Sequence, residues 1–330
     1  MGRATFYTEL TAPLLRDGLQ AAIHELFRQV EYLDRINVFP VPDGDTGTNL
    51  ALTLASVLAV LERDATDHAG HLLQQVADAA LDGARGNSGA ILAQFLLGVA
   101  DHGATLERLS IGDLAAALSA GAGNARLALT APRDGTLLTL LETFARAFRD
   151  RSVAEPLDFA AVLRAVRPQL AAALARTTEQ LSELRVARVV DAGAAGFVAL
   201  IDGFARYLET GKIEVAAAPR RPQHDEPIPR TALGEHRYCT ECLITGRDID
   251  PRKVRESLHA LGSSVVVGGR ANKLRIHVHC NDPEQVFAVA ARFGDVGGRK
   301  IDDMQRQRSA AQHGRQRRVA IVTDSAADLP

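Results

Sequence analysis

The sequence lacks any apolar run of the roughly 18 residues that a helix needs to cross a bilayer. Its N-terminus, MGRATFYTEL, also lacks the basic and then apolar pattern of a secretory signal peptide. The sequence has no excess of positive charge, since the net charge of the 330 residues is −2. A general electrostatic attraction to nucleic acid is therefore not expected. With 46% apolar and 24% charged residues, the composition is that of a folded chain of two or three domains. We therefore expect a cytoplasmic protein with no transmembrane segment and no nucleic-acid partner.

Cysteine is rare, and the few cysteines are unevenly placed. All three fall between residues 239 and 280, whereas 40 of the 55 alanines precede residue 201. Alanine has the highest intrinsic helix propensity, and clustered cysteines in a cytoplasmic protein indicate metal or redox chemistry rather than disulfides. The sequence thus predicts a helical first domain and a metal-capable second domain.

The first 212 residues show the apolar spacing of amphipathic helices and no strand-like alternation. Short loops rich in Gly, Asp, Asn and Thr separate the helical segments. We predict an all-α domain over residues 1–212, with eight helices that can pack as an antiparallel barrel. The predicted helices cover residues 8–34, 48–63, 70–84, 88–101, 110–129, 136–149, 158–183 and 193–210.

The pattern changes after a proline-rich stretch at 213–235, which predicts a linker. Over 236–305, strands and helices follow the order β-α-β-β-α-β, which is typical of a small α+β, ferredoxin-like domain with its first and third strands central. The predicted strands are 237–245, 263–268, 273–280 and 296–303, and the predicted helices are 251–261 and 283–293.

A basic stretch at 299–318 contains no aromatic residue that could stack on a base, so we interpret it as solvated chain rather than as a site for nucleic acid or acidic lipid. We assign 306–318 to a second linker. The last twelve residues, 319–330, read as the first strand of an α/β domain. The chain is therefore expected to be a fragment of a longer protein.

The most informative loop runs from residue 34 to residue 49. Asp43 and Asp45 flank a glycine, and two carboxylates this close repel each other unless a cation such as Mg²⁺ lies between them. A predicted helix begins just after them, where free N–H groups attract anions. The alternative is an Asp-Gly turn that only caps this helix.

Other small polar loops of this domain precede helices in the same way, at Arg85–Gly89, Asp134–Thr136 and Val189–Gly193. If the helices form a barrel, these loops can gather at one rim and hold a nucleotide phosphate chain with its metal. There is no Walker A sequence and no strand followed by Gly-x-Gly-x-x-Gly, and lysine is nearly absent. Nucleotide chemistry is therefore expected to rely on Mg²⁺, backbone amides and hydroxyls rather than on lysine.

In the second domain, His277 and His279 lie two apart on a predicted strand, so both imidazoles leave the same face. Cys239 on the neighbouring central strand can join them, and three N/S ligands suit Zn²⁺. The alternative is an ordinary polar sheet face. Strand alternation places Cys242 on the side opposite Cys239, and Cys280 away from His279.

These motifs together resemble a known family. The run Asn37–Asn49, with Ala84–Gly89, Gly135–Thr139 and Val190–Gly193, is similar to the ATP-binding subunit of bacterial fatty acid kinase, whose first domain resembles the DhaL subunit of dihydroxyacetone kinases. The resemblance spans roughly residues 8–305. It implies an eight-helix barrel that binds ATP with two Mg²⁺ ions, and a middle domain with a zinc site that keeps an open fourth position.

The resemblance also implies roles for individual residues. Asp43 and Asp45 are the implied Mg²⁺ ligands and catalytic residues, and either Asp34 or Asn37 supplies a further ligand upstream, with Asp34 favoured for its charge. Cys239, His277 and His279 are the implied Zn²⁺ ligands. The implied nucleotide-binding residues are Thr46, Thr48, Asn49, Asn87, Ser88, Gly89, Gly135 and Thr136.

Residues 319–330 resemble the first strand of a DegV-like fatty-acid-binding protein, which in this family presents the fatty acid to the kinase. We expect such a carrier as partner, either in cis or in trans. The sequence leaves the oligomeric state open, a homodimer included.

The function implied is an ATP- and Mg²⁺-dependent kinase that phosphorylates the carboxylate of a carrier-bound fatty acid and gives acyl phosphate for phospholipid synthesis. Two alternatives stay open: a kinase subunit for dihydroxyacetone or another small polyol, and a nucleotide-binding regulatory module without turnover of its own. We expect these 330 residues to bind ATP but to need added carrier for efficient phosphorylation.

Overall fold

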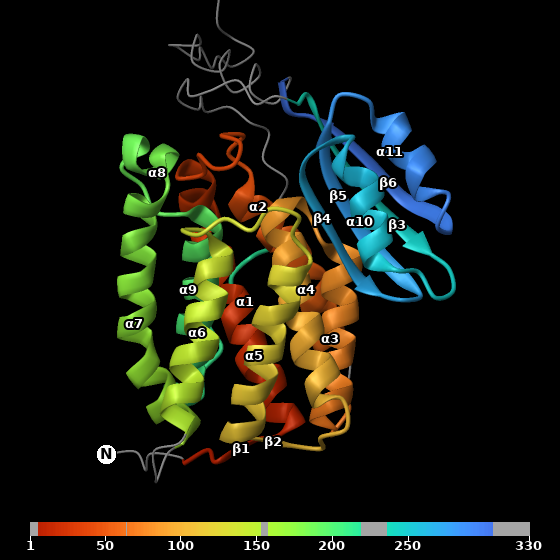
Figure 1. Cartoon of the computed structure of the whole chain (residues 1–330). Helices are drawn as coiled ribbons and strands as arrows, with labels where there is room; N and C mark the ends of the chain where they lie inside the picture. The colour runs from red at the N-terminus through yellow and green to blue at the C-terminus, as the bar shows by residue number, and fades with distance from the viewer. Residues whose placement is uncertain (1–5, 64, 153–157, 219–235, 306–330) are drawn as a thin grey trace, which may run out of the picture.

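The structure is a computed structural model, and it describes residues 6–63, 65–152, 158–218 and 236–305 (Figure 1). A bundle of upright helices is followed by a small domain of strands and helices that lies against one upper side of the bundle. The predicted linker 213–235 is described only up to residue 218, and the predicted segments 306–318 and 319–330 lie outside the described residues.

Eight long helices form a closed ring, which confirms the predicted barrel. Each of them packs on the next, and the last packs back on the first. Short loops between antiparallel neighbours bring alternate helix N-termini to one rim of the barrel. The helices of the ring are α1 (Ala12–Arg35), α2 (Thr46–Leu61), α3 (Ala69–Gly83), α4 (Gly86–Gly103), α5 (Ile111–Leu127), α6 (Leu137–Ser152), α7 (Phe159–Gln180) and α9 (Ala192–Thr210).

Two details of the helical prediction are wrong. Helix α1 begins at Ala12 instead of residue 8, because the Thr11 hydroxyl accepts from the Leu14 amide and proline occupies the first turn. The two residues before Thr11 form strand β1 (Glu9–Leu10), which pairs with β2 (Leu109–Ser110), so the domain is not wholly helical. The predicted helix 158–183 is also broken at Leu181, whose backbone is extended, and a short helix α8 (Ser182–Ala187) follows.

The interior of the barrel is apolar. Leucine, alanine and phenylalanine side chains from all eight long helices form one buried cluster, and they enclose a cavity of about 140 Å³. Within it Phe197 makes edge-to-face contacts with Phe95 and Phe144, at centroid distances of 5.9 and 5.6 Å. The many alanines let the helices approach closely, as their frequency before residue 201 predicts.

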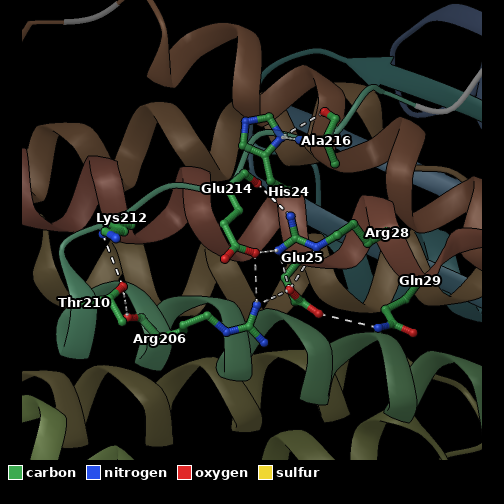
Figure 2. A network of polar contacts seen from close by, with 9 residues as sticks. All are labelled: His24, Glu25, Arg28, Gln29, Arg206, Thr210, Lys212, Glu214 and Ala216. Atoms are coloured by element: carbon green, nitrogen blue, oxygen red, sulfur yellow. Dashed lines mark hydrogen bonds and ion pairs between the residues drawn. The ribbon is translucent and has the colours of Figure 1, made fainter.

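A polar network closes the barrel between α1 and α9 (Figure 2). The buried carboxylate of Glu25 accepts hydrogen bonds from Arg28 and from Arg206, the latter at 2.8 Å. Burial opposes ionisation of Glu25, but the two guanidinium groups outweigh it and lower the pKa of the carboxyl. Arg28 also donates to the backbone oxygen of Glu214 at 2.8 Å, which holds the chain after α9 against α1.

The second domain is a four-stranded antiparallel sheet with two helices. Its strands are ordered β4-β5-β3-β6, so the first and third strands of the domain are central, as predicted. Its elements are β3 (Tyr238–Thr245), α10 (Pro251–His259), β4 (Gly262–Arg270), β5 (Lys273–Cys280), α11 (Pro283–Ala290) and β6 (Asp295–Asp303).

The two faces of this sheet have different roles. Cys242 and Cys280 point to the outer face, where they are buried in an apolar core with Val254 of α10 and Phe287 of α11. The odd-numbered residues of the central strands β3 and β5 point to the inner face, toward the barrel. The inner face is polar, because it carries Cys239, Glu241, Arg275, His277 and His279.

The barrel and the sheet are joined by backbone pairing as well as by side chains. The segment after α5 lies along the edge strand β4, where the Val267 amide donates to the Ala128 oxygen at 3.2 Å and the Thr130 amide donates to the Val265 oxygen at 3.4 Å. This pairing covers a strand edge that would otherwise be exposed. Nearby, Arg270 forms ion pairs with Asp78 and Asp101.

The two domains approach each other closely at Gly268 on β4. A methyl group added there would lie 1.9 Å from Cδ of Gln94, which is buried on α4. We predict that Gly268→Ala lowers the free energy of unfolding by about 1–3 kcal/mol, the usual cost of overpacking, and speeds proteolysis between the domains. Gly297→Ala on β6 is the matched control, because nothing lies within 4 Å of the added methyl. Equal melting temperatures for the two variants would contradict this account of the interface.

No helix among the described residues is both long and apolar enough to cross a membrane.

Candidate functional site

A pocket lies where the rim of the barrel meets the inner face of the sheet. Its cavity of about 40 Å³ has room for a few water-sized groups, such as a metal ion with its waters. Residues from both domains line it: Asn37, Pro40, Val41, Asp43, Asp45, Thr46, Asn49, Gly86, Asn87 and Ser88 from the barrel, and Cys239, His277, His279, Lys300 and Asp302 from the sheet.

The loop before α2 forms one wall, and Asn37 organises it. The Asn37 side-chain oxygen accepts from the amides of Asp45 and Thr46, each at 3.1 Å, and its amide nitrogen donates to the Val41 oxygen at 3.2 Å. These bonds fold the loop back on itself and occupy two N–H groups at the start of α2. Asn37 thus lines the pocket, but its side chain is already hydrogen-bonded to the backbone of its own loop.

Asp34, the other candidate for an upstream ligand, is not among the pocket-lining residues. Its carboxylate accepts from the Thr48 amide at 2.9 Å and from the Thr48 hydroxyl at 2.7 Å. Burial raises the pKa of Asp34 to about 6, against these hydrogen bonds, and the nearby charge of Asp45 raises it further. Thr48 therefore directs its hydroxyl to Asp34, and neither side chain faces the pocket.

Asp43 and Asp45 do face the pocket, and their carboxyl groups are in contact. Burial raises the pKa of Asp45, while a hydrogen bond with Asp43 and the charge of Lys300 oppose that rise. Two carboxylates in contact must share either a proton or a cation. Oxygen ligands of this kind, with the Asn49 side chain also bonded to Asp45, suit Mg²⁺.

The loop before α4 forms the second part of the barrel wall. Gly86 has φ of +59°, and a side chain there would lie 2.7 Å from Nδ2 of Asn49, so glycine is needed on both counts. Asn87 and Ser88 follow it in the first turn of α4 and line the pocket. Gly89 lies behind them, against the hydroxyl of Thr53.

The loops before α6 and α9 reach the same rim but not this pocket. Gly193 lies next to Ser88 and Leu137, so three helix starts do gather there. Thr136 directs its hydroxyl to the Arg133 oxygen at 2.8 Å, and Gly135 packs against Gln180. Gly135 and Thr136 therefore stand apart from the other candidate nucleotide-binding residues.

Asp191 accepts hydrogen bonds at the starts of both α9 and α6, and its titration should make the free energy of unfolding depend on pH. Its buried carboxylate accepts from the amides of Ala194, at 2.8 Å, and of Leu137. Burial nevertheless raises the pKa of Asp191 to about 6. The stability that a raised pKa contributes is present below the unfolded value of about 3.8 and is lost as pH rises through about 6.

Asp191→Asn keeps a capping side chain and removes this titration. We predict that the variant gains stability relative to wild type between pH 4 and pH 7, by up to about 3 kcal/mol. Thermal melts at both pH values, without divalent metal, measure the difference. A constant difference in melting temperature would contradict the prediction.

The sheet side of the pocket brings Cys239, His277 and His279 together. Their ligand atoms all lie within 4.8 Å of one another. The two Nε2 atoms of the histidines face each other at 3.1 Å, close to the separation of about 3.3 Å expected for two nitrogens on one tetrahedral zinc. Burial raises the pKa of the Cys239 thiol, so a bound metal would have to displace its proton. The donor set and its spacing fit Zn²⁺.

Sequence reasoning missed three charged residues at the pocket. Lys300 and Asp302 come from β6, form an ion pair and line the pocket, and Glu241 lies buried beneath them on β3. The interpretation of the stretch 299–318 as solvated chain is therefore wrong at Lys300, whose side chain is largely buried at the pocket. No sequence signal identifies Lys300, because it lies in a run of basic residues more than 250 positions from Asp43.

Glu241 is surrounded by cationic and hydrogen-bonding groups. Burial opposes its ionisation, but a hydrogen bond from His277 and the charges of Lys300 and Arg275 outweigh burial and lower the pKa of the carboxyl. Strand alternation predicts that Glu241 faces the barrel, as Cys239 does, but gives the residue no further role.

Comparisons with known families match both parts of the chain. The DAK2 domain matches residues 40–206, and the FakA-like middle domain of fatty acid kinases matches residues 235–311. Together these two models cover the barrel from α2 to most of α9, the sheet, and every residue that lines the pocket except Asn37.

Several proteins are similar to this chain over most of its length. Protein YloV of Bacillus subtilis is 31% identical over 303 residues, which cover 88% of this chain and 55% of that protein. An uncharacterised protein of Staphylococcus epidermidis is 29% identical over 312 residues, which cover 91% and 56% of the two chains. This chain spans about half the length of the curated relatives that it matches.

Among solved structures, the dihydroxyacetone kinase from C. freundii in complex with AMP-PNP and Mg²⁺ is similar to this chain. The TM-score is 0.47 and the identity 17%, over 62% of this chain and 36% of that chain.

Proposed function

We propose that this chain, which belongs to the DAK2 domain family and continues into a FakA-like middle domain, is the ATP-binding subunit of a fatty acid kinase. The observation that carries the proposal is the shared pocket. The Asp43 and Asp45 carboxylates of the barrel face the Cys239, His277 and Lys300 side chains of the middle domain across it.

In the proposed reaction, a carboxylate oxygen of the fatty acid forms a bond with the γ-phosphorus of ATP. The bond from that phosphorus to the bridging oxygen breaks, and ADP leaves. A fatty-acid carboxylate is already ionised near neutral pH, so the step needs no general base. Positioning and charge neutralisation dominate such a transfer.

The residues of this chain have distinct tasks in that step. Asp43 and Asp45, with Asn37 holding their loop, are placed to bind Mg²⁺, which would neutralise phosphate oxygens. Thr46, Asn49, Asn87 and Ser88 offer hydroxyl, amide and backbone N–H groups at two helix starts to the phosphates. Lys300 adds a positive charge from the other side.

The middle domain adds a second candidate metal site on the opposite wall. Cys239, His277 and His279 would hold Zn²⁺, which would supply a Lewis acid beside the pocket. The matched middle domain, in addition to the barrel, favours a fatty-acid acceptor over a small polyol.

The test compares acceptors directly. ATP consumption by the chain is measured with Mg²⁺ and oleate presented by a DegV-like carrier protein, and separately with dihydroxyacetone. Carrier-dependent formation of acyl phosphate, trapped with hydroxylamine, is the expected result. Turnover with dihydroxyacetone alone would favour the polyol kinase, and Mg²⁺-dependent ATP binding without turnover on either acceptor would favour a regulatory module.

A further inference from the structure

The buried carboxylate of Glu241 lies between the two halves of the pocket, and neither proposed binding site includes it. Glu241 is 1% exposed and lies on the inner face of β3, two residues after Cys239. A carboxylate so deeply buried is stabilised only when every oxygen has partners. The identity of those partners gives the residue its role.

One oxygen of Glu241 contacts both candidate sites at once. Oε1 accepts from the backbone N–H of Gly86 at 2.8 Å and lies 3.1 Å from Nδ1 of His277. Gly86 is the first residue of α4 and precedes Asn87 and Ser88 in the pocket wall. A single carboxylate oxygen therefore connects a candidate metal ligand with the candidate phosphate loop.

The other oxygen fixes the same loop from its second side. Oε2 accepts from Nη2 of Arg275 at 3.0 Å, and the same nitrogen donates to the backbone oxygen of Ala84 at 2.7 Å. Glu241 and Arg275 thus hold the backbone at residues 84 and 86 between them. The middle domain therefore holds this loop together with the barrel, whose Thr53 hydroxyl accepts from the Arg85 amide at 3.1 Å.

Helix α4 depends on this contact, because its own N-cap residue provides none. Arg85 occupies the N-cap position, and its side chain makes no capping hydrogen bond. An unsatisfied N–H at a buried helix start is costly, and a carboxylate there also interacts favourably with the helix dipole. Glu241 supplies the missing cap from the other domain.

The metal site acts on this cap through the ring of His277. Because the ionised Glu241 carboxylate can only accept, Nδ1 of His277 carries the ring proton at 3.1 Å from Oε1, which leaves Nε2 free to bind a metal. A metal bound at Nε2 would therefore hold the imidazole that donates to Glu241, and with it the position of the carboxylate that holds Gly86.

We propose that Glu241 is a positioning residue that couples the Cys239/His277/His279 metal site to the Gly86–Ser88 loop, so that Zn²⁺ and nucleotide bind cooperatively. The inference rests on the proposed function, because it takes the Gly86–Ser88 loop to bind nucleotide phosphates. Cooperativity of this kind is reciprocal: each ligand tightens the other by the same factor.

The experiment measures two affinities in the full chain by calorimetry. AMP-PNP with excess Mg²⁺ is titrated into protein freed of zinc with a zinc-selective chelator, and again after saturation with Zn²⁺. Zn²⁺ affinity is then measured with and without AMP-PNP. In wild type we expect zinc to tighten AMP-PNP binding about 3- to 10-fold, and AMP-PNP to tighten zinc binding by that same factor.

In Glu241→Gln we expect zinc to bind roughly 10-fold more weakly, as loss of a ligand's hydrogen-bond partner usually causes. At saturating zinc the AMP-PNP affinity of this variant should no longer depend on zinc. Arg275→Lys, which keeps the charge but not the paired hydrogen bonds, is a second variant in case Glu241→Gln fails to fold, and its coupling factor should fall toward 1. Glu256→Gln, an exposed carboxylate on α10, is the matched control and should keep the wild-type factor.

If the AMP-PNP affinity depended on zinc equally in wild type and in Glu241→Gln, the proposed coupling would be overturned and the proposed function would stand. If the AMP-PNP affinity of wild type did not depend on zinc, the coupling would be overturned as well. If AMP-PNP did not bind wild type under any condition, the proposed function and the inference would both fail.

Discussion

Asp43→Ala should reduce ATP turnover by roughly 1,000-fold or more while leaving the fold intact, because losing charge neutralisation at a transferring phosphoryl group costs about that much. Asp43 contacts Asp45 in the pocket wall, and removing it leaves Asp45 without the partner with which it would share a cation. Steady-state ATP hydrolysis or acyl phosphate formation, with circular dichroism for the fold, measures the effect.

Asp150→Ala is a suitable control, because Asp150 is exposed at the opposite end of α6. It should keep wild-type turnover. Undiminished activity of Asp43→Ala under saturating Mg²⁺ would exclude the pocket as the nucleotide site and return the Asp-Gly motif to the role of a helix-capping turn.

Lys300→Met should lower kcat by about 100-fold and change the affinity for AMP-PNP much less, because a charge that acts on the transferred phosphoryl group contributes most in the transition state. Lys300 lines the pocket from β6 and forms an ion pair with Asp302. A strongly lowered kcat with retained AMP-PNP binding would indicate that Lys300 acts in the transition state. Lys300→Arg should recover part of the rate.

Lys253→Met makes the same substitution at an exposed position of α10 and should behave as wild type.

Lys300 also lies 3.7 Å from the buried Glu241, so Lys300→Met will destabilise the sheet. Melting temperatures must therefore be measured together with the kinetics. If Lys300→Met folded and retained full kcat, Lys300 would have only a structural role.

The sequence predicted the architecture well, because the barrel and the sheet both depend on short-range periodicity. Apolar spacing located all eight long helices, and strand alternation correctly separated Cys239 on the inner face from Cys242 in the outer core. Both signals arise within a few residues of the chain, where the period of the element determines the direction of a side chain.

The errors in the fold arose where tertiary contacts prevailed over local pattern. The two-residue strand Glu9–Leu10 has too few residues to show alternation, and it exists only because Leu109 and Ser110 lie beside it. The break at Leu181 falls within a helical pattern that continues on both sides, so periodicity alone could not place it.

The pocket could be predicted only in its separate halves. The Asp43–Asn49 and Arg85–Gly89 loops, and the Cys239/His277/His279 triad, each carry a local signal. Their meeting across the domain interface does not, since it depends on the docking of β4 against the segment after α5 and on Glu241 reaching Gly86. Lys300 and Asp302 could be recognised as pocket residues only after that docking was known.

The central claim is that one nucleotide site is built from both domains, and hydrogen–deuterium exchange tests it most directly. The full chain is compared with and without AMP-PNP and Mg²⁺. We predict protection of backbone amides at 43–49 and 86–89 in the barrel and, in the same experiment, at 298–303 in β6. Protection confined to the barrel, or located away from these segments, would contradict the account.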